Sequence, residues 1–223
     1  MGELVERLSK LDSCAVSDAL DRLKRPGVVL GIHSLSVDRR ISGRVITVQL
    51  GSADGKPSER HLCTAAVDAA KPGDIIVVAN EGKTNVSGWG GTLSLGAVQK
   101  GVSGIIVDGA CRDIDESRHL NLPVYARAAV PLTARGRIIE TDWNCPVKLG
   151  DVAVNPGDYV LADGSGTVFV SSMDAEEVIS VAEEIYEREQ KMAAAVRAGH
   201  PMANVMGASY ENLLNLGDWK DDE

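Results

Sequence analysis

The sequence predicts a single α/β domain, and two observations support that prediction. The chain has 223 residues, of which 44% are apolar, enough to bury one substantial core. Residues 43–50 (GRVITVQL) alternate as a strand does, and residues 74–79 (DIIVVA) form an apolar run of strand length. Between them, residues 61–71 have helical spacing and end before Pro72 and Gly73. A strand, a helix and a second strand are typical of a crossover unit in an α/β sheet.

Helices are expected at both ends of this domain. Near the start, leucine and valine recur at helical spacing in two segments, with Ser13 as the expected N-cap of the second and residues 25–27 (RPG) at its end. The apolar positions are Leu4, Leu8, Leu11, Val16, Leu20 and Leu23. Near the other end, Asp174 and Glu177 fit a capping box that begins a long helix. Its apolar stripe is Val178, Val181, Ile185 and Met192.

The middle of the chain repeats the strand and helix pattern, and short strands separated by turns then follow. Residues 92–101 have a helical period despite Gly96, residues 104–109 form an apolar strand, and a helical turn follows. After that, glycine and proline turns separate short strands, which predicts a mainly antiparallel second half. The expected strands lie within residues 123–130, 137–143, 146–163 and 166–170.

Charge and hydropathy exclude several classes of partner. The 32 acidic and 23 basic residues give a net charge of −9 without a basic stripe, so we expect no nucleic-acid binding. The first residues lack the apolar core of an export signal, and the longest apolar runs are far shorter than the roughly 20 residues of a membrane helix. The sequence therefore predicts a cytoplasmic protein that does not bind membranes.

The four cysteines do not form a metal motif. They are widely separated, with no C-x-x-C pair and no histidine at zinc-finger spacing, so we expect free thiols. They are Cys14, Cys63, Cys111 and Cys145, and only Cys111 is next to a candidate site residue, Arg112.

The C-terminal segment is expected to lie outside the main core. Residues 1–200 are assigned to the domain and residues 201–223 to a terminal segment, whose apolar part follows Gly199. Such a segment packs either on its own domain or on a neighbouring subunit, and we expect the latter. The protein is thus expected to be an oligomer.

A glycine-rich segment is the first candidate for ligand binding. Gly88, Gly90 and Gly91 precede the helix that is expected to start near Thr92. Backbone N–H groups would converge there at a helix N-terminus, where the dipole favours a carboxylate or a phosphate. The alternative is a tight turn between Asn80 and the helix.

The second candidate follows the next strand, in the stretch DGACRDIDE. Arg112 and Asp113 lie where ligand-facing loops occur in open α/β sheets, at the carboxyl end of a strand. The alternative is structural: Asp113 and Glu116 also fit a capping box, with Arg112 in a surface ion pair.

Together the two loops predict a site for a small 2-oxo acid. Adjacent strands lie only about 5 Å apart, so their ends bring the loops together. The acid's carboxylate would bind the loop amides and its keto oxygen would face the Arg112 guanidinium. Asp113 would hold Mg²⁺ or Mn²⁺, an ion that prefers oxygen ligands and keeps several waters. Such a site stabilises an enolate.

These motifs resemble a known family. GWGG, a helix and G-I-I-V-D-G-x-x-R-D are similar to the RraA-like family, which includes 4-hydroxy-4-methyl-2-oxoglutarate and 4-carboxy-4-hydroxy-2-oxoadipate aldolases. The resemblance extends over VSDAL, PGDIIVVAN, ARAAVPLTARGR, VNPGDYVLADGSGTVFV and the last helix, which is most of the chain. An older label of the family is menaquinone methyltransferase, but this sequence has no methyl-donor fingerprint.

The resemblance implies a fold, an assembly and roles for particular residues. The implied fold is a β/β/α sandwich of the swivelling-domain type, assembled as homotrimers or homohexamers with active sites at subunit boundaries. In the family's class II aldolases, the counterpart of Arg112 binds the keto or enolate oxygen, and the counterpart of Asp113 binds the divalent metal partly through water. The pyruvyl carboxylate is held by the loop at Gly90, Gly91, Thr92 and Leu93.

One position departs from the family's aldolases. They place an acidic residue 21 positions before the arginine, where this chain has Gly91. Aldol cleavage needs a base worth on the order of 10²–10⁴ in rate. His61, Lys83 or Glu211 of the partner subunit are candidates to replace it. Oxaloacetate-type decarboxylation needs no such base, so we expect it to be stronger than aldol cleavage.

The sequence therefore predicts a divalent-metal-dependent lyase, a class II aldolase or decarboxylase. A non-catalytic regulator, like the family's ribonuclease-binding branch, is the alternative, because that branch shares the glycine pattern. A Schiff-base aldolase that uses Lys83 or Lys100 is a third hypothesis, disfavoured because both lysines lie in polar stretches where the amine stays protonated.

Overall fold

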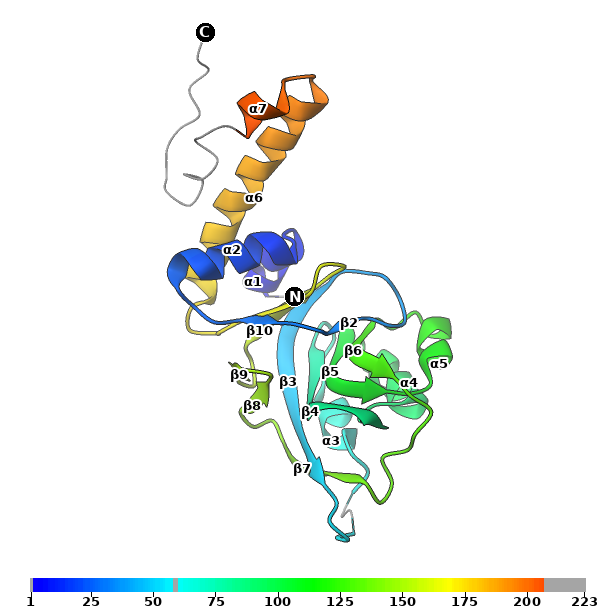
Figure 1. The fold of residues 1–223 in the computed structure, drawn as a ribbon. Helices are drawn as coiled ribbons and strands as arrows, with labels where there is room; N and C mark the ends of the chain where they lie inside the picture. Colours follow the sequence, from blue (N-terminus) through cyan, green and yellow to red (C-terminus); the bar gives the residue numbers. More distant parts are fainter. Residues whose placement is uncertain (1, 58–59, 207–223) are drawn as a thin grey trace.

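A mixed sheet runs through the molecule in the order β1-β11-β10-β3-β4-β5-β6-β2, with β7 paired to β3 (Figure 1). The structure is a computed structural model that describes residues 2–57 and 60–206. The strands are β1 Val28–Val29, β2 His33–Ser34, β3 Ile41–Ser52, β4 Ile75–Ser87, β5 Gly104–Cys111, β6 Val124–Ala129, β7 Ile138–Trp143, β8 Val147–Leu149, β9 Val152–Val154, β10 Tyr159–Ala162 and β11 Thr167–Val170. The helices are α1 Glu3–Ser9, α2 Ser13–Leu23, α3 Thr64–Ala69, α4 Gly91–Gln99, α5 Ile114–His119, α6 Ala175–Arg197 and α7 Met202–Val205.

The centre of the sheet is parallel and is built from crossover units, as the sequence predicts as far as β5; β6, expected in the mainly antiparallel second half, also pairs in parallel. β3, β4, β5 and β6 pair in parallel, and α3, α4 and α5 connect them in turn. These helices cover one face of the sheet, over a buried cluster that includes Val48, Ile76 and Ile105. Because the strands are parallel, their carboxyl ends, and the loops that follow β4 and β5, meet at the same edge.

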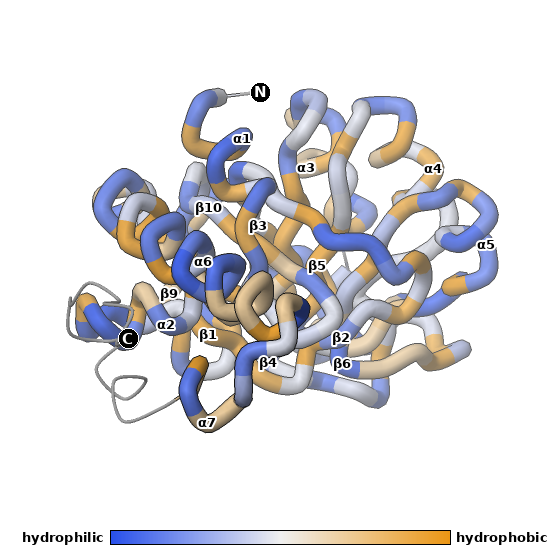
Figure 2. The backbone as a smooth tube through the Cα atoms, turned by 90° about the horizontal axis from the view of Figure 1, so that it is seen from above, coloured by the Kyte–Doolittle hydropathy of each residue, from blue (hydrophilic) through white to orange (hydrophobic). Residues whose placement is uncertain are grey.

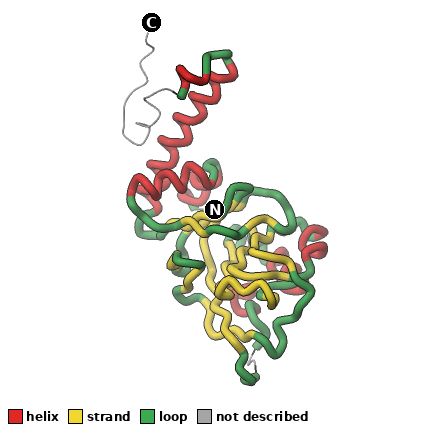
Figure 3. Tube along the Cα trace, viewed as in Figure 1, coloured by secondary structure: helices red, strands yellow, loops and turns green. Residues whose placement is uncertain are grey.

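Two further buried clusters complete the layers. One lies between the other face of the parallel strands and β8, β9 and β10, and it includes Val77, Val154 and Val160. In the other cluster, α1, α2 and α6 pack against β10 and β11 (Figure 3). Hydrophobic segments follow the strands, whereas α5 is largely hydrophilic on the outside (Figure 2). The α/β fold class and the layered sandwich are thus confirmed.

Several predicted helix ends differ from those in the structure. Asp12, not Ser13, is the N-cap residue of α2, and its carboxylate accepts from Ala15 N at 2.9 Å. The helix expected over residues 61–71 begins at Thr64, because Cys63 is left-handed with φ 65°, and ends at Ala69. Asp174 precedes α6 without a side-chain cap bond.

The strand expected over residues 74–79 is much longer in the structure. β4 continues to Ser87, after an irregular stretch in which Glu81 and Gly82 have positive φ. Its last part still pairs with β5, as Lys83 lies opposite Gly109 and Ser87 opposite Ala110. This extension carries the glycine-rich segment past the end of β5.

Helix α6 leaves the body of the protein halfway along its length (Figure 1). Its buried residues, Ala175, Val178, Ile179 and Ala182, all lie in the first third, and α7 follows at its far end. No helix among residues 2–57 and 60–206 is long and apolar enough to cross a membrane. Of the segment predicted to dock on a neighbouring subunit, residues 207–223 lie outside the described part of the chain, so docking stays a prediction.

Candidate active site

The loops after β4 and β5 are joined by backbone hydrogen bonds. Gly88 N donates to Ala110 O at 2.8 Å, and Arg112 N donates to Trp89 O at 2.9 Å. The pairing of β4 with β5 thus continues into the loops. The structure brings together the glycine-rich segment and the arginine–aspartate pair that sequence analysis selected separately.

The Asp113 carboxylate links the two loops. Its Oδ2 accepts from Gly91 N at 3.0 Å, and its Oδ1 accepts from Arg112 Nε at 3.1 Å. Asp113 adopts a left-handed backbone, φ 58°, and precedes α5 without a side-chain cap to that helix. The alternative of a capping box with Glu116 is therefore not formed; instead, Asp113 reaches across to the first amide of α4.

The bare backbone of this segment is required by close approach. A Cβ on Gly90 would lie 3.0 Å from Asp113 Oδ2 and 3.2 Å from Arg112 Cγ. On Gly91 it would lie 1.5 Å from Glu116 Oε2 and 3.2 Å from Asp113 Cβ. The side chains of the second loop thus lie directly over the backbone of the first, so a Cβ at either glycine would force them to move.

A buried hydrogen-bonded network holds α4 and α5 in register. Trp89, 1% exposed, donates from Nε1 to Ser94 Oγ at 2.9 Å, and Ser94 Oγ lies 2.9 Å from Ser117 Oγ. Ser87 Oγ donates to Trp89 O at 2.6 Å. Because each of these groups is paired and buried, the network fixes the loop between them.

Open donors remain at this edge. Among the described residues, none accepts a hydrogen bond from the backbone N–H groups of Thr92 and Leu93, in the first turn of α4. The Arg112 side chain is 38% exposed and that of Asp113 is 31% exposed. The site therefore combines a partly exposed guanidinium and carboxylate with two backbone donors that no described residue engages.

The other predicted candidates make their polar contacts elsewhere. His61 Nδ1 lies 3.1 Å from Leu62 O, and Lys83 pairs with Glu81 at 2.6 Å. Lys100 donates to Asp68 O at 2.7 Å. The third proposed replacement base, residue 211, lies outside the described residues.

The thiol beside Arg112 is not available as a thiolate. Cys111 is buried at the end of β5, and its burial raises the thiol pKa to about 12. At neutral pH the group is therefore protonated and poorly nucleophilic.

Sequence reasoning missed two residues of this region. Glu116 was considered only as part of a capping box, although its carboxylate lies over Gly91. Asn80 is fully buried, and neither its amide oxygen nor its nitrogen has a partner among the described residues. Its Nδ2 lies 2.9 Å from where a Cβ on Gly109 would be, which accounts for that glycine. No local pattern marks either contact, since both partners are distant in sequence.

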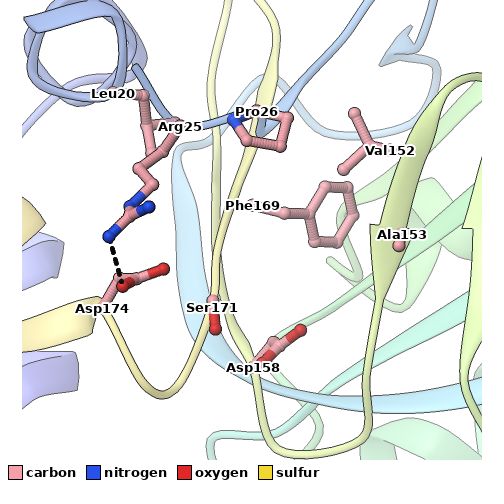
Figure 4. A pocket seen from close by; sticks show the side chains of 9 residues that line it. All are labelled: Leu20, Arg25, Pro26, Val152, Ala153, Asp158, Phe169, Ser171 and Asp174. Atoms are coloured by element: carbon pink, nitrogen blue, oxygen red, sulfur yellow. Dashed lines mark ion pairs between the residues drawn. The ribbon is translucent and has the colours of Figure 1, made fainter. Parts of the chain in front are cut away.

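A separate hollow of about 100 Å³ lies between α2, β9 and β11 (Figure 4). Its charged groups are already paired. Arg25 contacts Asp174 at 3.4 Å, and the Asp158 carboxylate accepts from Asn155 N and Ser172 N.

Fold and site together are those of an α/β protein in which two joined loops lie at the carboxyl ends of adjacent parallel strands. The chain belongs to the RraA-like family, described as Aldolase/RraA, which matches residues 13–169.

The similar proteins include one named as a putative aldolase and one described as a member of an RNase inhibitor family. The chain is 30% identical over 184 residues, 81% of this chain and 82% of the relative, to "Putative 4-hydroxy-4-methyl-2-oxoglutarate aldolase" of Halalkalibacterium halodurans. It is 28% identical over 199 residues to Protein DlpA of Legionella pneumophila, covering 89% of this chain but only 32% of that longer protein. A crystal structure of Streptomyces coelicolor RraAS2, an unusual member of the RNase ES inhibitor RraA protein family, superposes with a TM-score of 0.78 at 28% identity, covering 86% of this chain and 98% of that one.

Proposed function

We propose that the protein is a carbon–carbon lyase that acts on a small 2-oxo carboxylic acid through an enolate, as a class II aldolase, a decarboxylase or both. The observation that carries this proposal is the position of Arg112 and Asp113 over the Gly90–Gly91 backbone. Relatives named as aldolases, at about 30% identity, support the same class.

The free amides of α4 suit the substrate's carboxylate. Thr92 N and Leu93 N point out of the first helical turn, where the helix dipole also favours an anion. Gly91 was expected to join them, but its amide already donates to Asp113. Its role in this proposal is therefore to hold Asp113 in place.

Arg112 suits the oxygen on which negative charge develops. Asp113 holds its Nε, and no described residue pairs with the two terminal nitrogens. A guanidinium fixed at Nε presents its remaining donors in one plane, so it can bind the enolate oxygen as that charge forms.

A divalent metal fits the residues present in one particular way. Among the described residues, no three His, Cys, Asp or Glu side chains group into a metal cage. Mg²⁺, however, commonly binds through one or two carboxylates and keeps several waters as its other ligands. Asp113 can provide one such carboxylate. The bound ion would supply further electrostatic stabilisation of the enolate.

A regulatory binding protein is the second candidate function. It is favoured by the structural similarity to RraAS2, whose family is described as an RNase inhibitor family. Under that hypothesis, Arg112 and Asp113 would form an exposed ion pair, worth about 0–1 kcal/mol. Neither would then matter for any chemical activity.

Pyruvate release separates the two functions. The purified protein would be incubated with oxaloacetate and a panel of 4-hydroxy-2-oxo acids, with Mg²⁺ or Mn²⁺ and with EDTA. We expect metal-dependent pyruvate from at least one compound. Absence of both turnover and metal binding would favour the regulator.

A further inference from the structure

The Glu116 carboxylate occupies the space above Gly91 that any other residue would fill with its own side chain. A Cβ at position 91 would lie 1.5 Å from Glu116 Oε2 and 2.7 Å from Glu116 Cδ. Two carboxylate side chains therefore meet at Gly91, one from Asp113 and one from Glu116. A side chain at position 91 would require the Glu116 carboxylate to move away.

The two carboxylates differ in their partners. Asp113 accepts from Gly91 N and from Arg112 Nε, so both of its oxygens are engaged. The Glu116 carboxylate has no hydrogen-bond donor or ion-pair partner among the described residues, and its residue is exposed to solvent. Of the two, Glu116 is therefore the one free to accept a proton.

We propose that Glu116 is the general base for aldol cleavage at this site, an inference that rests on the proposed lyase function. The Arg112 stem lies over Gly90 and the Glu116 carboxylate over Gly91, so the two side chains lie over consecutive residues of the first loop. A substrate bound along this backbone would have its enolate-forming end near Arg112 and its hydroxyl near Glu116.

The chemical step balances without any further reactant. Glu116 takes the proton of the C4 hydroxyl of a 4-hydroxy-2-oxo acid, and the O–H electrons form the new carbonyl as the C3–C4 bond breaks. The electrons of that bond give the pyruvate enolate, whose oxygen faces Arg112. The proton held by Glu116 then returns to C3, which yields pyruvate and restores the carboxylate. Oxaloacetate has no C4 hydroxyl, so its decarboxylation does not need this base.

The deciding variant is Glu116→Gln, which keeps the shape over Gly91 but cannot take the proton. We expect kcat for 4-hydroxy-2-oxo acid cleavage to fall by on the order of 10² or more. Oxaloacetate decarboxylation should stay within about threefold, because that reaction uses the enolate-binding half of the site alone.

Asp115→Asn is the matched control. Asp115 lies on the same turn of α5, but its side chain is 84% exposed and pairs with Arg118 at 2.6 Å. Its substitution should leave both reactions unchanged. Mg²⁺ affinity, measured by calorimetric titration, should be equal in Glu116→Gln and wild type, since the proposal assigns Glu116 a proton and not the metal.

A relocated carboxylate tests the geometry independently. The double variant Gly91→Asp with Glu116→Ala returns a carboxylate to the same volume from the opposite loop. Its kcat for cleavage should be at least about tenfold higher than that of Glu116→Ala alone, because a positioned base usually contributes more than that to the rate.

Each remaining outcome overturns the inference and shows what has failed. Full cleavage by Glu116→Gln would remove Glu116 from the reaction while the lyase function stands. Equal loss of cleavage and decarboxylation, or loss of Mg²⁺ binding, would assign Glu116 to binding instead of proton transfer. If the wild-type protein releases no pyruvate from any compound, the proposed function fails, and the base assignment fails with it.

Discussion

Asp163 and Asp113 each accept a hydrogen bond from the first amide of a helix on another segment, but their surroundings differ. Asp163, after β10, accepts from Ser13 N at 2.8 Å, from Ser13 Oγ at 2.6 Å and from Ser165 N at 2.9 Å. Its side chain is 12% exposed. Asp113 accepts from Gly91 N and Arg112 Nε and is 31% exposed.

The difference lies in the residue that supplies the amide. Ser13 adds a hydroxyl that donates a further hydrogen bond to Asp163, so this carboxylate ties α2 to the β10–β11 turn. Gly91 adds nothing and leaves space, which Glu116 enters. The same helix-end contact thus serves structure in one place and leaves an open, charged edge in the other. Four predictions test this distinction, from the largest expected effect to the smallest.

Removal of the Asp113 carboxylate should abolish metal-dependent activity, whereas removal of the Asp163 carboxylate should not. Asp113→Ala should abolish the recovery of activity when Mg²⁺ is added to EDTA-treated protein, because the carboxylate that holds the ion is gone. Asp163→Ala should leave that recovery intact at a temperature where the variant is folded. The measurement is pyruvate release against Mg²⁺ concentration. Equal recovery in Asp113→Ala and wild type would exclude Asp113 from the site.

Replacement of the arginines by lysine should separate the two regions in the same way. Arg112→Lys should lower oxaloacetate turnover by on the order of 10², because lysine cannot present a planar pair of donors. Arg40→Lys, beside Asp163 at 3.9 Å, should not alter turnover. Thermal unfolding of the same preparations is the control. Unchanged activity in Arg112→Lys would contradict the catalytic role, and a matching loss of melting temperature would assign the effect to folding.

Stability should depend on Asp163 more than on Asp113. Asp163→Asn weakens three hydrogen bonds to a charged acceptor, so we expect a loss of about 2 kcal/mol and about 4–8 °C in melting temperature. Asp113→Asn should shift the melting temperature by much less, because its contacts are half-exposed and worth about 0–1 kcal/mol. Calorimetry of both variants gives the comparison. A larger loss in Asp113→Asn would reverse the assignment of structure and function.

The smallest effect is the pH dependence that Asp163 contributes. Burial alone raises the pKa of this carboxyl group, but hydrogen bonds from Ser13 and Ser165 and the Arg40 charge lower it on balance below 3.8. A lowered folded-state pKa gives stability that is present above the unfolded value and lost as pH falls through the folded one. The unfolding free energy of wild type should therefore fall more steeply below pH 4 than that of Asp163→Asn. Parallel curves would show that these bonds do not favour the ionised form.

The sequence allowed prediction of what depends on local patterns. Apolar periodicity identified β3, β4 and β5 and the helices that connect them, but not that β6 is parallel to β5; the glycine and arginine motifs marked the loops after β4 and β5. Long-range contacts were not predictable in this way. Asp163 and Ser13 are 150 positions apart, and Asp174 fits a capping box yet pairs with Arg25. Glu116 over Gly91 is a further case, because an absent side chain at 91 does not indicate which residue fills the space.

The buried Trp89 gives this edge of the protein an optical reporter. Its indole donates to Ser94 and its carbonyl accepts from Arg112 N and Ser87 Oγ, so the chromophore is joined to both loops. Trp143, on β7, is only half-buried and belongs to another edge of the sheet. Quenching or a spectral shift of Trp89 emission, isolated in a background in which Trp143 and Trp219 are both replaced by Phe, would follow occupancy of the loops in a titration without any label or turnover.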